Sequence, residues 1–171
     1  MSLSHEAVPV TLPEVSITQM TEHDLLEVVE LEETSGLSRW GWAAYYAELQ
    51  GDNKHLMLVA RLPARHEERH SPNLAGYIVA RIGAEELHIN NVAVREGHRR
   101  RGLGRSLLDH VLAEARRAGV TRAFLELRAG NSAALALYES YGFKVTSRRV
   151  RYYSDPVEDA LVMIIDLGRT A

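Results

Sequence analysis

The stretch NNVAVREGHRRRGLGRSLLDHVLAEARRAG, residues 90–119, contains the strongest structural pattern in the chain. A short apolar segment leads into a loop rich in arginine and glycine, and the loop leads into an amphipathic segment. Five apolar residues recur at the spacing of one helical face: Leu103, Leu107, Leu108, Val111 and Leu112. Gly119 stands where a glycine commonly ends a helix. The stretch therefore predicts a strand, a loop and a long helix, in that order.

The loop in this stretch has the composition of an anion-binding site. Gly102 and Gly104 let the backbone bend and approach a ligand closely. The first turn of the following helix offers free N–H groups, and neighbouring arginines add charge-assisted contacts. These features suit a diphosphate; a glycine turn with a solvated basic face is the alternative. No Gly-Lys-Ser/Thr follows, and the third glycine of the dinucleotide fingerprint is missing, so neither nucleotide-loop motif applies.

The composition favours one globular domain. The chain has 171 residues, of which 46% are hydrophobic and 25% charged, and its net charge is -3. Five arginines and one acidic residue lie between Arg95 and Arg105. This local positive charge suits a compact anionic ligand better than a nucleic acid. Cysteine is absent, which excludes disulfides, cysteine-bound zinc and a thiol nucleophile.

The sequence shows no targeting pattern. The first residues lack the basic and apolar regions of a secretory signal, and no apolar run approaches the length of a membrane span. We therefore expect a cytoplasmic protein that binds neither a membrane nor, directly, a nucleic acid. Residues 1–13 are expected to form a flexible N-terminal lead, and residues 14–171 a single domain.

Apolar periodicity and turn residues predict the other elements. The expected strands are 14–20, 55–62, 74–83, 86–94, 121–129, 143–153 and 160–167. The expected helices are 21–33, 102–119 and 131–142, while 38–50 is either a helix or a loop leading into one. Thr21 and Asp24 resemble a capping box, and a hairpin turn is expected near Gly83 and Ala84. An antiparallel start followed by a helical crossover predicts a mixed α/β, or α+β, sheet.

This order of elements resembles the GNAT superfamily of acetyltransferases. The acetyl-CoA loop pattern of that family, Arg/Gln-x-x-Gly-x-Gly, matches Arg99, Gly102 and Gly104. The resemblance extends over residues 15–167 and is strongest over 86–167. It implies a mostly antiparallel sheet with a splayed central parallel pair, flanked by about four helices. It also implies acetyl-CoA as the co-substrate and CoA as the product.

Three segments are similar to the RimI-type members of that family: NVAV…RRRGLGRSLLDHVL, LELRAGNSAALALYESYGF and RRVRYY…EDALVMIIDL. RimI-type enzymes acetylate the N-terminal alanine of a small-subunit ribosomal protein. The resemblance therefore implies a protein or peptide N-terminus, such as that of a ribosomal protein, as the acceptor. A lysine side chain, a small-molecule amine and a non-catalytic acetyl-CoA-binding module are the alternatives.

The resemblance assigns acetyl-CoA to three places. Val92, Ala93 and Val94 match the strand end whose backbone holds the pantetheine arm and the thioester carbonyl, although they also suit a plain buried strand end. Asn131 matches an asparagine that contacts the cofactor, although it also suits a plain helix N-cap. The pyrophosphate loop comprises Arg99, Arg100, Arg101, Gly102, Leu103, Gly104 and Arg105.

Glu126 is an acidic residue in the apolar segment AFLELRA. Phe124, Glu126 and Arg128 share one face of the predicted strand, and Leu125 and Leu127 share the other. A solvated face or an ion pair with Arg128 would explain the carboxylate. By resemblance, Glu126 is instead the general base that takes a proton from the amine. An N-terminal α-amine, with a pKa of about 8 against about 10.4 for lysine, suits a carboxylate base better.

Tyr138 lies in the predicted helix 131–142 and is either a core residue or, by resemblance, the general acid that protonates the CoA thiolate. Tyr141 lies three residues further on and does not align with that acid. Because the chain has no cysteine, an acyl-cysteine route is excluded. We therefore expect direct attack of the amine in a ternary complex.

Trp40, Tyr152 and Tyr153 correspond by resemblance to the walls of the acceptor groove, and ordinary aromatic packing is the alternative. Arg39 and Gly41 flank Trp40 where RimI-type enzymes tend to have Pro-Trp-Ser. The acceptor groove is therefore not expected to be a plain copy of the family's groove.

The segment HEERH, residues 66–70, matches the H-E-x-x-H zinc pattern. It lies between two prolines that leave room for barely two helical turns, and it has no apolar stripe with which to dock. We expect a solvated loop and no metal site. His88, His98 and His110 show no ligand spacing and are expected to be surface or packing residues.

Overall fold

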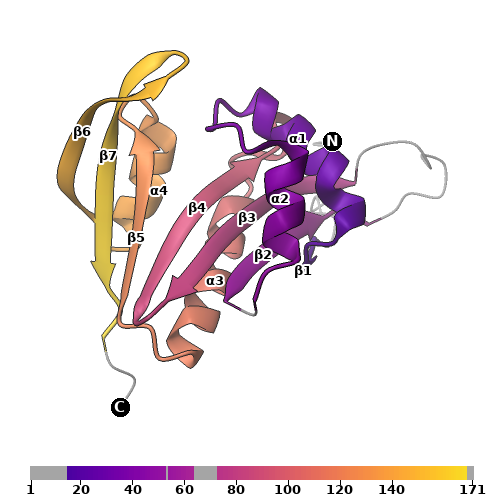
Figure 1. Cartoon of the computed structure of the whole chain (residues 1–171), viewed down its shortest axis with the longest axis horizontal. Helices are drawn as coiled ribbons and strands as arrows, with labels where there is room; N and C mark the ends of the chain where they lie inside the picture. The colour runs from indigo at the N-terminus through magenta and orange to yellow at the C-terminus, as the bar shows by residue number, and fades with distance from the viewer. Residues whose placement is uncertain (1–14, 53, 64–72, 169–171) are drawn as a thin grey trace, which may run out of the picture.

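The computed structural model describes residues 15–52, 54–63 and 73–168 (Figure 1). The expected N-terminal lead, residues 1–13, and the HEERH motif lie outside the described residues. The helices of the described part are η1 (Glu22–Asp24), α1 (Leu25–Thr34), α2 (Gly41–Leu49), η2 (Glu96–His98), α3 (Leu103–Arg117) and α4 (Ser132–Ser140). Its strands are β1 (Ser16–Gln19), β2 (His55–Arg61), β3 (Leu74–Gly83), β4 (Glu86–Val94), β5 (Arg122–Arg128), β6 (Lys144–Ser154) and β7 (Val157–Asp166).

The strands of the described part form one sheet in the order β1-β2-β3-β4-β5-β7-β6. Every neighbouring pair is antiparallel except β4 and β5, which are parallel and are connected through α3. Helices α1 and α2 cover one face of the sheet, and α3 and α4 cover the other (Figure 1). The predicted mixed sheet with one central parallel pair is confirmed. No helix in the described ranges is long and apolar enough to cross a membrane.

Local sequence signals account for several element boundaries. The backbone N–H of Thr21 donates to Asp24 Oδ2 at 2.7 Å, so the expected capping box is present. Residues 38–50, which the sequence predicts as a helix or as a loop leading into one, contain helix α2, and a loop at residues 35–40 precedes it. Strand β7 begins three residues earlier than expected, at Val157, because it forms a hairpin with β6 that turns through Asp155 and Pro156 alone. The expected loop before β7 is therefore mostly strand.

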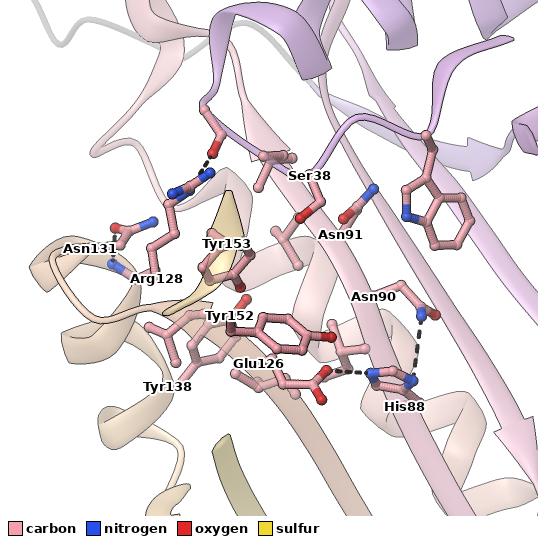
Figure 2. Close-up of a pocket in the computed structure, with 18 residues that line it drawn as sticks. Ser38, His88, Asn90, Asn91, Glu126, Arg128, Asn131, Tyr138, Tyr152 and Tyr153 are labelled. Carbon is pink, nitrogen blue, oxygen red and sulfur yellow. Dashed lines mark hydrogen bonds and ion pairs between the residues drawn. The ribbon is translucent and has the colours of Figure 1, made fainter. Parts of the chain in front are cut away.

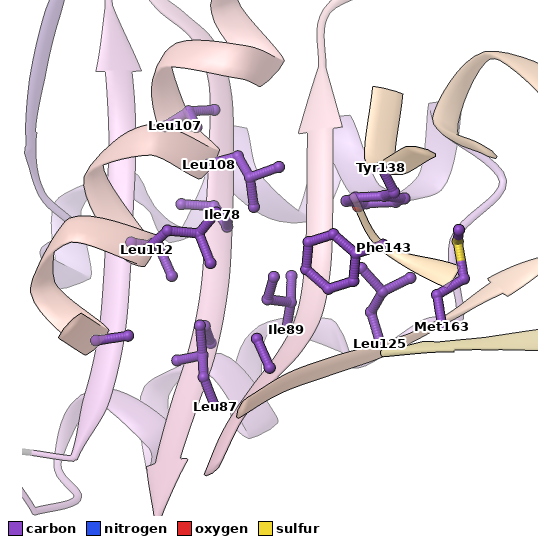
Figure 3. Close-up of a cluster of buried hydrophobic side chains, with 14 of the residues drawn as sticks. Ile78, Leu87, Ile89, Leu107, Leu108, Leu112, Leu125, Tyr138, Phe143 and Met163 are labelled. Carbon is purple, nitrogen blue, oxygen red and sulfur yellow. The ribbon is translucent and has the colours of Figure 1, made fainter. Parts of the chain in front are cut away.

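The apolar face of α3 is buried as its spacing predicts. Leu107, Leu108 and Leu112 pack against the sheet in a cluster that includes Ile78 of β3 and Leu125 of β5 (Figure 3). A leucine fully removed from water contributes roughly 1.5–3 kcal/mol to the free energy of folding. Several such residues on one helix fix α3 against the sheet. They also fix the arginine-glycine loop, residues 95–102, because this loop runs directly into α3.

The parallel pair is short. β4 and β5 are paired only from Glu86 and Arg122 to Ile89 and Leu125, over four residue pairs. Beyond this point the two strands diverge toward the ends that carry Val94 and Arg128, which is the splay that the family resemblance implies (Figure 1). The backbone groups that β4 and β5 turn toward each other there have no partner in the strand opposite.

A β-bulge in β4 lies at the start of the splay. Ala80 of β3 pairs with Ile89 and Val79 pairs with Asn91, so Asn90 is the extra residue. A bulge shifts the side-chain alternation of a strand by one residue. Ile89 accordingly packs on the α3 side, whereas Asn91 contacts Tyr45 of α2 on the opposite side. The bulge thereby directs polar side chains of β4 toward the space between the parted strands.

Candidate active site

A cavity of about 200 Å³ opens where β4 and β5 separate (Figure 2). β4 contributes residues 88–92 to its lining, and β5 contributes residues 125–128. The loop between α1 and α2, helix α4 and the end of β6 complete its walls. No cluster of three potential metal ligands occurs in residues 15–52, 54–63 and 73–168. The cavity lining presents carboxylate, phenol, imidazole and amide groups.

The Glu126 carboxylate lies in this cavity and is held by two basic side chains. Its side chain is 14% exposed, and its Oε2 lies 3.1 Å from His88 Nε2. Its Oε1 lies 2.9 Å from Arg149 Nη1, which reaches over from β6. Leu125 and Leu127 point to the α3 side, as the alternation predicts. The alternative explanation, an ion pair between Glu126 and Arg128, is wrong because Arg128 bonds Glu158 and three backbone carbonyls instead.

His88 is a member of this cluster that sequence reasoning missed. The sequence predicts a surface or packing residue, and its ring does stack on Phe124 at 4.3 Å. The ring also reaches Glu126, a contact that the sequence does not predict (Figure 2). The register explains both contacts, because His88 pairs with Phe124 across the parallel strands and Glu126 lies two residues further along β5. Only the pairing of strands far apart in the sequence reveals this contact.

His88 contacts Glu126 and Asn90 through its two ring nitrogens. The Glu126 carboxylate accepts from His88 Nε2 at 3.1 Å. On the other side of the ring, Nδ1 lies 3.4 Å from Asn90 Nδ2. Asn90 Oδ1 is buried and has no hydrogen-bond partner among the described residues. This carbonyl oxygen is suited to accept an N–H from a ligand in the splay.

Tyr138 faces the same cavity from α4. Its ring is 7% exposed and packs edge-on against Phe143 at 5.7 Å. Burial, and to a smaller extent the nearby Tyr153, raises the pKa of the Tyr138 phenol above its ordinary range. Tyr141 points elsewhere: its hydroxyl lies 2.6 Å from Asp109 Oδ1 on α3. Tyr138 thus belongs both to the core and to the cavity, so the two alternatives for it are compatible.

The arginine-glycine loop presents its charges unevenly. Arg99 Nε donates to Val94 O at 2.9 Å, and Arg105 Nη2 donates to Ser140 Oγ at 3.0 Å. Arg100 and Arg101 are exposed and form no hydrogen bond or ion pair with the described residues. These two side chains are therefore available to an anion outside the protein.

The backbone of the loop is shaped to begin a helix at the splay. Gly102 has φ +81° and precedes the first residue of α3, and Arg100 has φ +60°. Side chains rarely adopt these left-handed angles, which favour glycine at 102. Leu103 is buried in the sheet-facing side of α3. Gly104 has no side chain, and a Cβ there would lie 3.5 Å from Leu137. Both can therefore offer only their backbone N–H groups to a ligand, at the positive end of the α3 dipole.

Val92, Ala93 and Val94 lie on the splayed part of β4. They pair with Ile78, Tyr77 and Gly76 of β3, and no β5 residue pairs with them. In an extended strand, alternate backbone groups face each neighbour, so those facing β5 are open to a ligand, apart from Val94 O, which accepts Arg99 Nε. Val92 and Ala93 also pack in the two cores on either side of the sheet, so the buried strand end and the open backbone edge coexist.

Asn131 caps helix α4. Its Oδ1 accepts the backbone N–H of Ala134 at 3.0 Å, which confirms the N-cap expected from the sequence. The residue also lines the cavity, and its amide nitrogen donates to no described residue. One side chain can therefore begin the helix that carries Tyr138 and still reach a ligand.

The three expected acceptor residues, Trp40, Tyr152 and Tyr153, all line the cavity. The tyrosine rings meet edge-on at 5.2 Å, and burial, as the main cause, raises the pKa of Tyr153 to about 12. Trp40 packs on Tyr45 at 5.4 Å. Aromatic packing, the alternative for these residues, is therefore present in the walls of the cavity.

A bulge in β6 places Tyr152 at the cavity. Three residues of β6 lie between Arg149 and Tyr153, opposite the single residue Asp159 of β7. Asp159 stabilises this bulge, because its Oδ1 accepts the Arg151 N–H at 2.8 Å and its Oδ2 accepts Arg148 Nε at 2.6 Å. These hydrogen bonds lower the pKa of Asp159.

The fold and this site define an acetyltransferase of the GNAT class, and the chain belongs to the acetyltransferase (GNAT) family, whose model matches residues 23–143. The [ribosomal protein bS18]-alanine N-acetyltransferase of Escherichia coli K12 is 40% identical over 97 residues, 56% of this chain and 66% of that enzyme. Its namesake in Salmonella typhimurium is 30% identical over 155 residues, 90% of this chain and 98% of the relative.

Solved structures give the same result. The crystal structure of the E. coli ribosomal-protein-S18-alanine N-acetyltransferase aligns with a TM-score of 0.77 and 28% identity, over 92% of this chain and 97% of that chain. The predicted membership of the GNAT superfamily and the similarity to its RimI-type members are confirmed.

Proposed function

We propose that this chain transfers the acetyl group of acetyl-CoA to the N-terminal α-amine of a protein by direct attack in a ternary complex. The observation that carries the proposal is the position of Glu126. Its carboxylate is mostly buried, faces the cavity at the splay and shares that cavity with the phenol of Tyr138. Acetyl transfer to an amine needs these two functions, one group that accepts a proton and one that donates a proton.

Glu126 acts as the general base in this proposal. An ammonium group must lose a proton before its nitrogen can attack a carbonyl carbon, and an α-amine does so more readily than a lysine. His88 Nε2 donates to one carboxylate oxygen and Arg149 to the other, which fixes the plane of the carboxylate. A fixed carboxylate is already oriented when the acceptor arrives, so little reorganisation is needed.

Tyr138 acts as the general acid. Departure of the CoA sulfur leaves a thiolate, which a nearby O–H can protonate. A phenol with the ordinary tyrosine pKa of about 10 is protonated at neutral pH, and burial raises the pKa of Tyr138 further, so the group holds a proton to donate. The hydroxyl then recovers its proton from solvent or from the proton released at Glu126.

The residues present fit acetyl-CoA, which would supply the activated acetyl group. Arg100 and Arg101, together with the backbone N–H groups at Gly102–Arg105, would hold the pyrophosphate at the start of α3. The open backbone edge of Val92–Val94 would hold the pantetheine arm and polarise the thioester carbonyl. Asn131 and the unpartnered Asn90 Oδ1 offer further polar contacts to that arm.

The acceptor enters past Trp40, Tyr152 and Tyr153. Relatives named for acetylation of the N-terminal alanine of ribosomal protein bS18 support a protein N-terminus beginning with alanine. The cavity of about 200 Å³ is consistent with a small first residue beside the thioester end of acetyl-CoA. A cytoplasmic location, and the absence of direct nucleic-acid binding, stay predictions from the sequence.

Two peptides test the proposal. The first begins with a free alanine followed by the sequence of a bS18 N-terminus, and the second has a blocked N-terminus and an internal lysine. We expect acetyl transfer from acetyl-CoA to the first alone, measured by mass spectrometry and by thiol release. Transfer only to the lysine peptide would overturn the α-amine assignment. Binding of acetyl-CoA without transfer to either peptide would favour another acceptor or a binding module.

A further inference from the structure

Arg128 lies at the splayed end of β5, two residues after Glu126, and lines the cavity (Figure 2). It contacts segments on both sides of the acceptor groove. Its side chain is only 16% exposed. Its Nε donates to Gly36 O in the α1–α2 loop at 3.0 Å. On the other side, its Nη2 donates to Asp155 O at 2.9 Å and its Nη1 to Pro156 O at 3.0 Å in the β6–β7 turn. One guanidinium therefore bridges the α1–α2 loop and the β6–β7 turn, two segments that no strand pairing joins.

Two further contacts fix the orientation of this guanidinium. Glu158 Oε2 lies 3.2 Å from Arg128 Nη1, and the Tyr153 ring lies under the guanidinium at 4.3 Å. The other carboxylate oxygen of Glu158 accepts the Gly130 N–H at 2.6 Å. Gly130 directly precedes Asn131, the cap of the helix that carries Tyr138. The contacts of Arg128 thus extend from the acceptor groove to the start of α4.

We propose that Arg128 is a positioning residue that sets the width of the acceptor groove. It does so by holding the α1–α2 loop and the β6–β7 turn against the strand that carries Glu126. The inference rests on the proposed function in one respect, namely that the groove receives the acceptor N-terminus. The bridge itself is defined by the contacts of Arg128 alone.

The chemistry of the bridge requires arginine. Three of its acceptors are carbonyls of loop and turn residues, which take part in no helix or strand ladder. A guanidinium presents five N–H donors in a rigid plane, and four of them are used here. A lysine ammonium keeps the charge but cannot span acceptors on opposite sides of the group. Arg128→Lys therefore removes the bridge while keeping the charge.

The first test separates acceptor binding from the chemical step. For Arg128→Lys we expect KM for the alanine peptide to rise about 10-fold or more, since several charge-assisted hydrogen bonds are lost. We expect kcat to stay within about threefold of the wild type and the Kd of acetyl-CoA within about twofold, because a substitution that weakens only acceptor binding raises KM and leaves kcat unchanged. Arg122→Lys is the matched control, because Arg122 lies on the same strand face and has one exposed contact. An unchanged KM, or an equal rise in the Kd of acetyl-CoA, would overturn the proposal.

The second test needs no turnover. Hydrogen exchange of the full chain is compared between the wild type and Arg128→Lys. We expect faster exchange in both residues 36–41 and residues 152–158, with unchanged exchange in α3. Faster exchange in one segment alone, or in neither, would refute the bridge. If the wild type acetylates no α-amine, the proposed function fails, and the exchange data still decide whether Arg128 couples the two segments.

Discussion

The two ends of the β4–β5 pair place similar residues in different surroundings. At the paired end, Glu86 and Arg122 face each other at 3.4 Å, with side chains 48% and 56% exposed. At the splayed end, Glu126 and Arg128 are 14% and 16% exposed, and each has at least two charged or polar partners. The same strand face therefore carries an ordinary surface ion pair at one end and an enclosed network at the other.

The difference shows how the splay creates a site. Where the strands are hydrogen-bonded, their backbones are satisfied and their polar side chains face water, where an ion pair contributes little. Where the strands part, backbone groups and side chains are enclosed together by the α1–α2 loop and β6. Electrostatic interactions are stronger in such enclosed surroundings. Substitutions at the splayed end should therefore change acetyl transfer far more than substitutions at the paired end.

The largest effect is expected for Glu126→Gln. Gln has nearly the same shape but cannot accept a proton from an ammonium group, so kcat should fall about 10²–10⁴-fold, the usual range for loss of a general base. The Kd of acetyl-CoA should stay within about twofold, because the cofactor loop is unchanged. Steady-state kinetics and titration calorimetry measure the two quantities. A kcat within threefold of the wild type would contradict the assignment of Glu126 as base.

A smaller loss is expected for Tyr138→Phe. The ring should keep its packing on Phe143, while kcat should fall about 10²-fold, the lower end of the range expected for loss of a proton donor. Because the pKa of Tyr138 is raised, the wild-type phenol keeps its proton as the pH rises through the ordinary tyrosine pKa of about 10. The wild type should therefore show no rate loss from this group between pH 7 and 10. A loss in that range that disappears in Tyr138→Phe would contradict this prediction.

A still smaller loss of activity is expected for His88→Gln. The Gln amide can still donate one hydrogen bond to Glu126, so kcat/KM should fall only about 3–10-fold, as for one hydrogen bond to a charged group. In the double variant with Glu126→Gln the two losses should not add, since both residues act through one carboxylate. Kinetics of the two single variants and the double variant test this. Full additivity would show that His88 acts independently of Glu126.

The smallest effect is expected for Arg122→Ala at the paired end. This change removes an exposed ion pair, so the free energy of unfolding should change by no more than about 0.5 kcal/mol. Transfer kinetics should stay within about twofold of the wild type. Thermal unfolding and the peptide assay measure both quantities. A large loss of transfer would mean that the two ends of β5 are not functionally distinct.

Much of the architecture could be predicted because its signals are local. The leucine spacing of α3, the capping box at Thr21 and the alternation around Glu126 depend on residues within a few positions of each other. Such short-range periodicities define which face of an element is buried. The residues that line the cavity, including Tyr138 and Trp40, could be named because a family resemblance supplied what the periodicity did not.

The errors involve contacts between distant segments. The sequence predicts His88 as a surface or packing residue and a solvated face or an ion pair with Arg128 for Glu126, because local patterns show only neighbours along the chain. The packing of His88 on Phe124 agrees with this prediction, whereas its contact with Glu126 is not predicted. In the folded chain, Arg128 instead contacts Gly36, 92 positions away, and His88 contacts Glu126, 38 positions away. The early start of β7 has the same origin, since it depends on pairing with β6.

The sequence by itself determined the succession of strands and helices along the chain, the buried faces and the glycine that precedes α3, since each follows from local periodicity and backbone sterics. Only the tertiary structure decided where β4 and β5 part, and which side chains meet there. That point depends on the parallel register and on the bulge at Asn90, which arise from packing on α3 and from pairing with β3. A partner for a charged side chain is decided by that non-local geometry, which no local pattern contains.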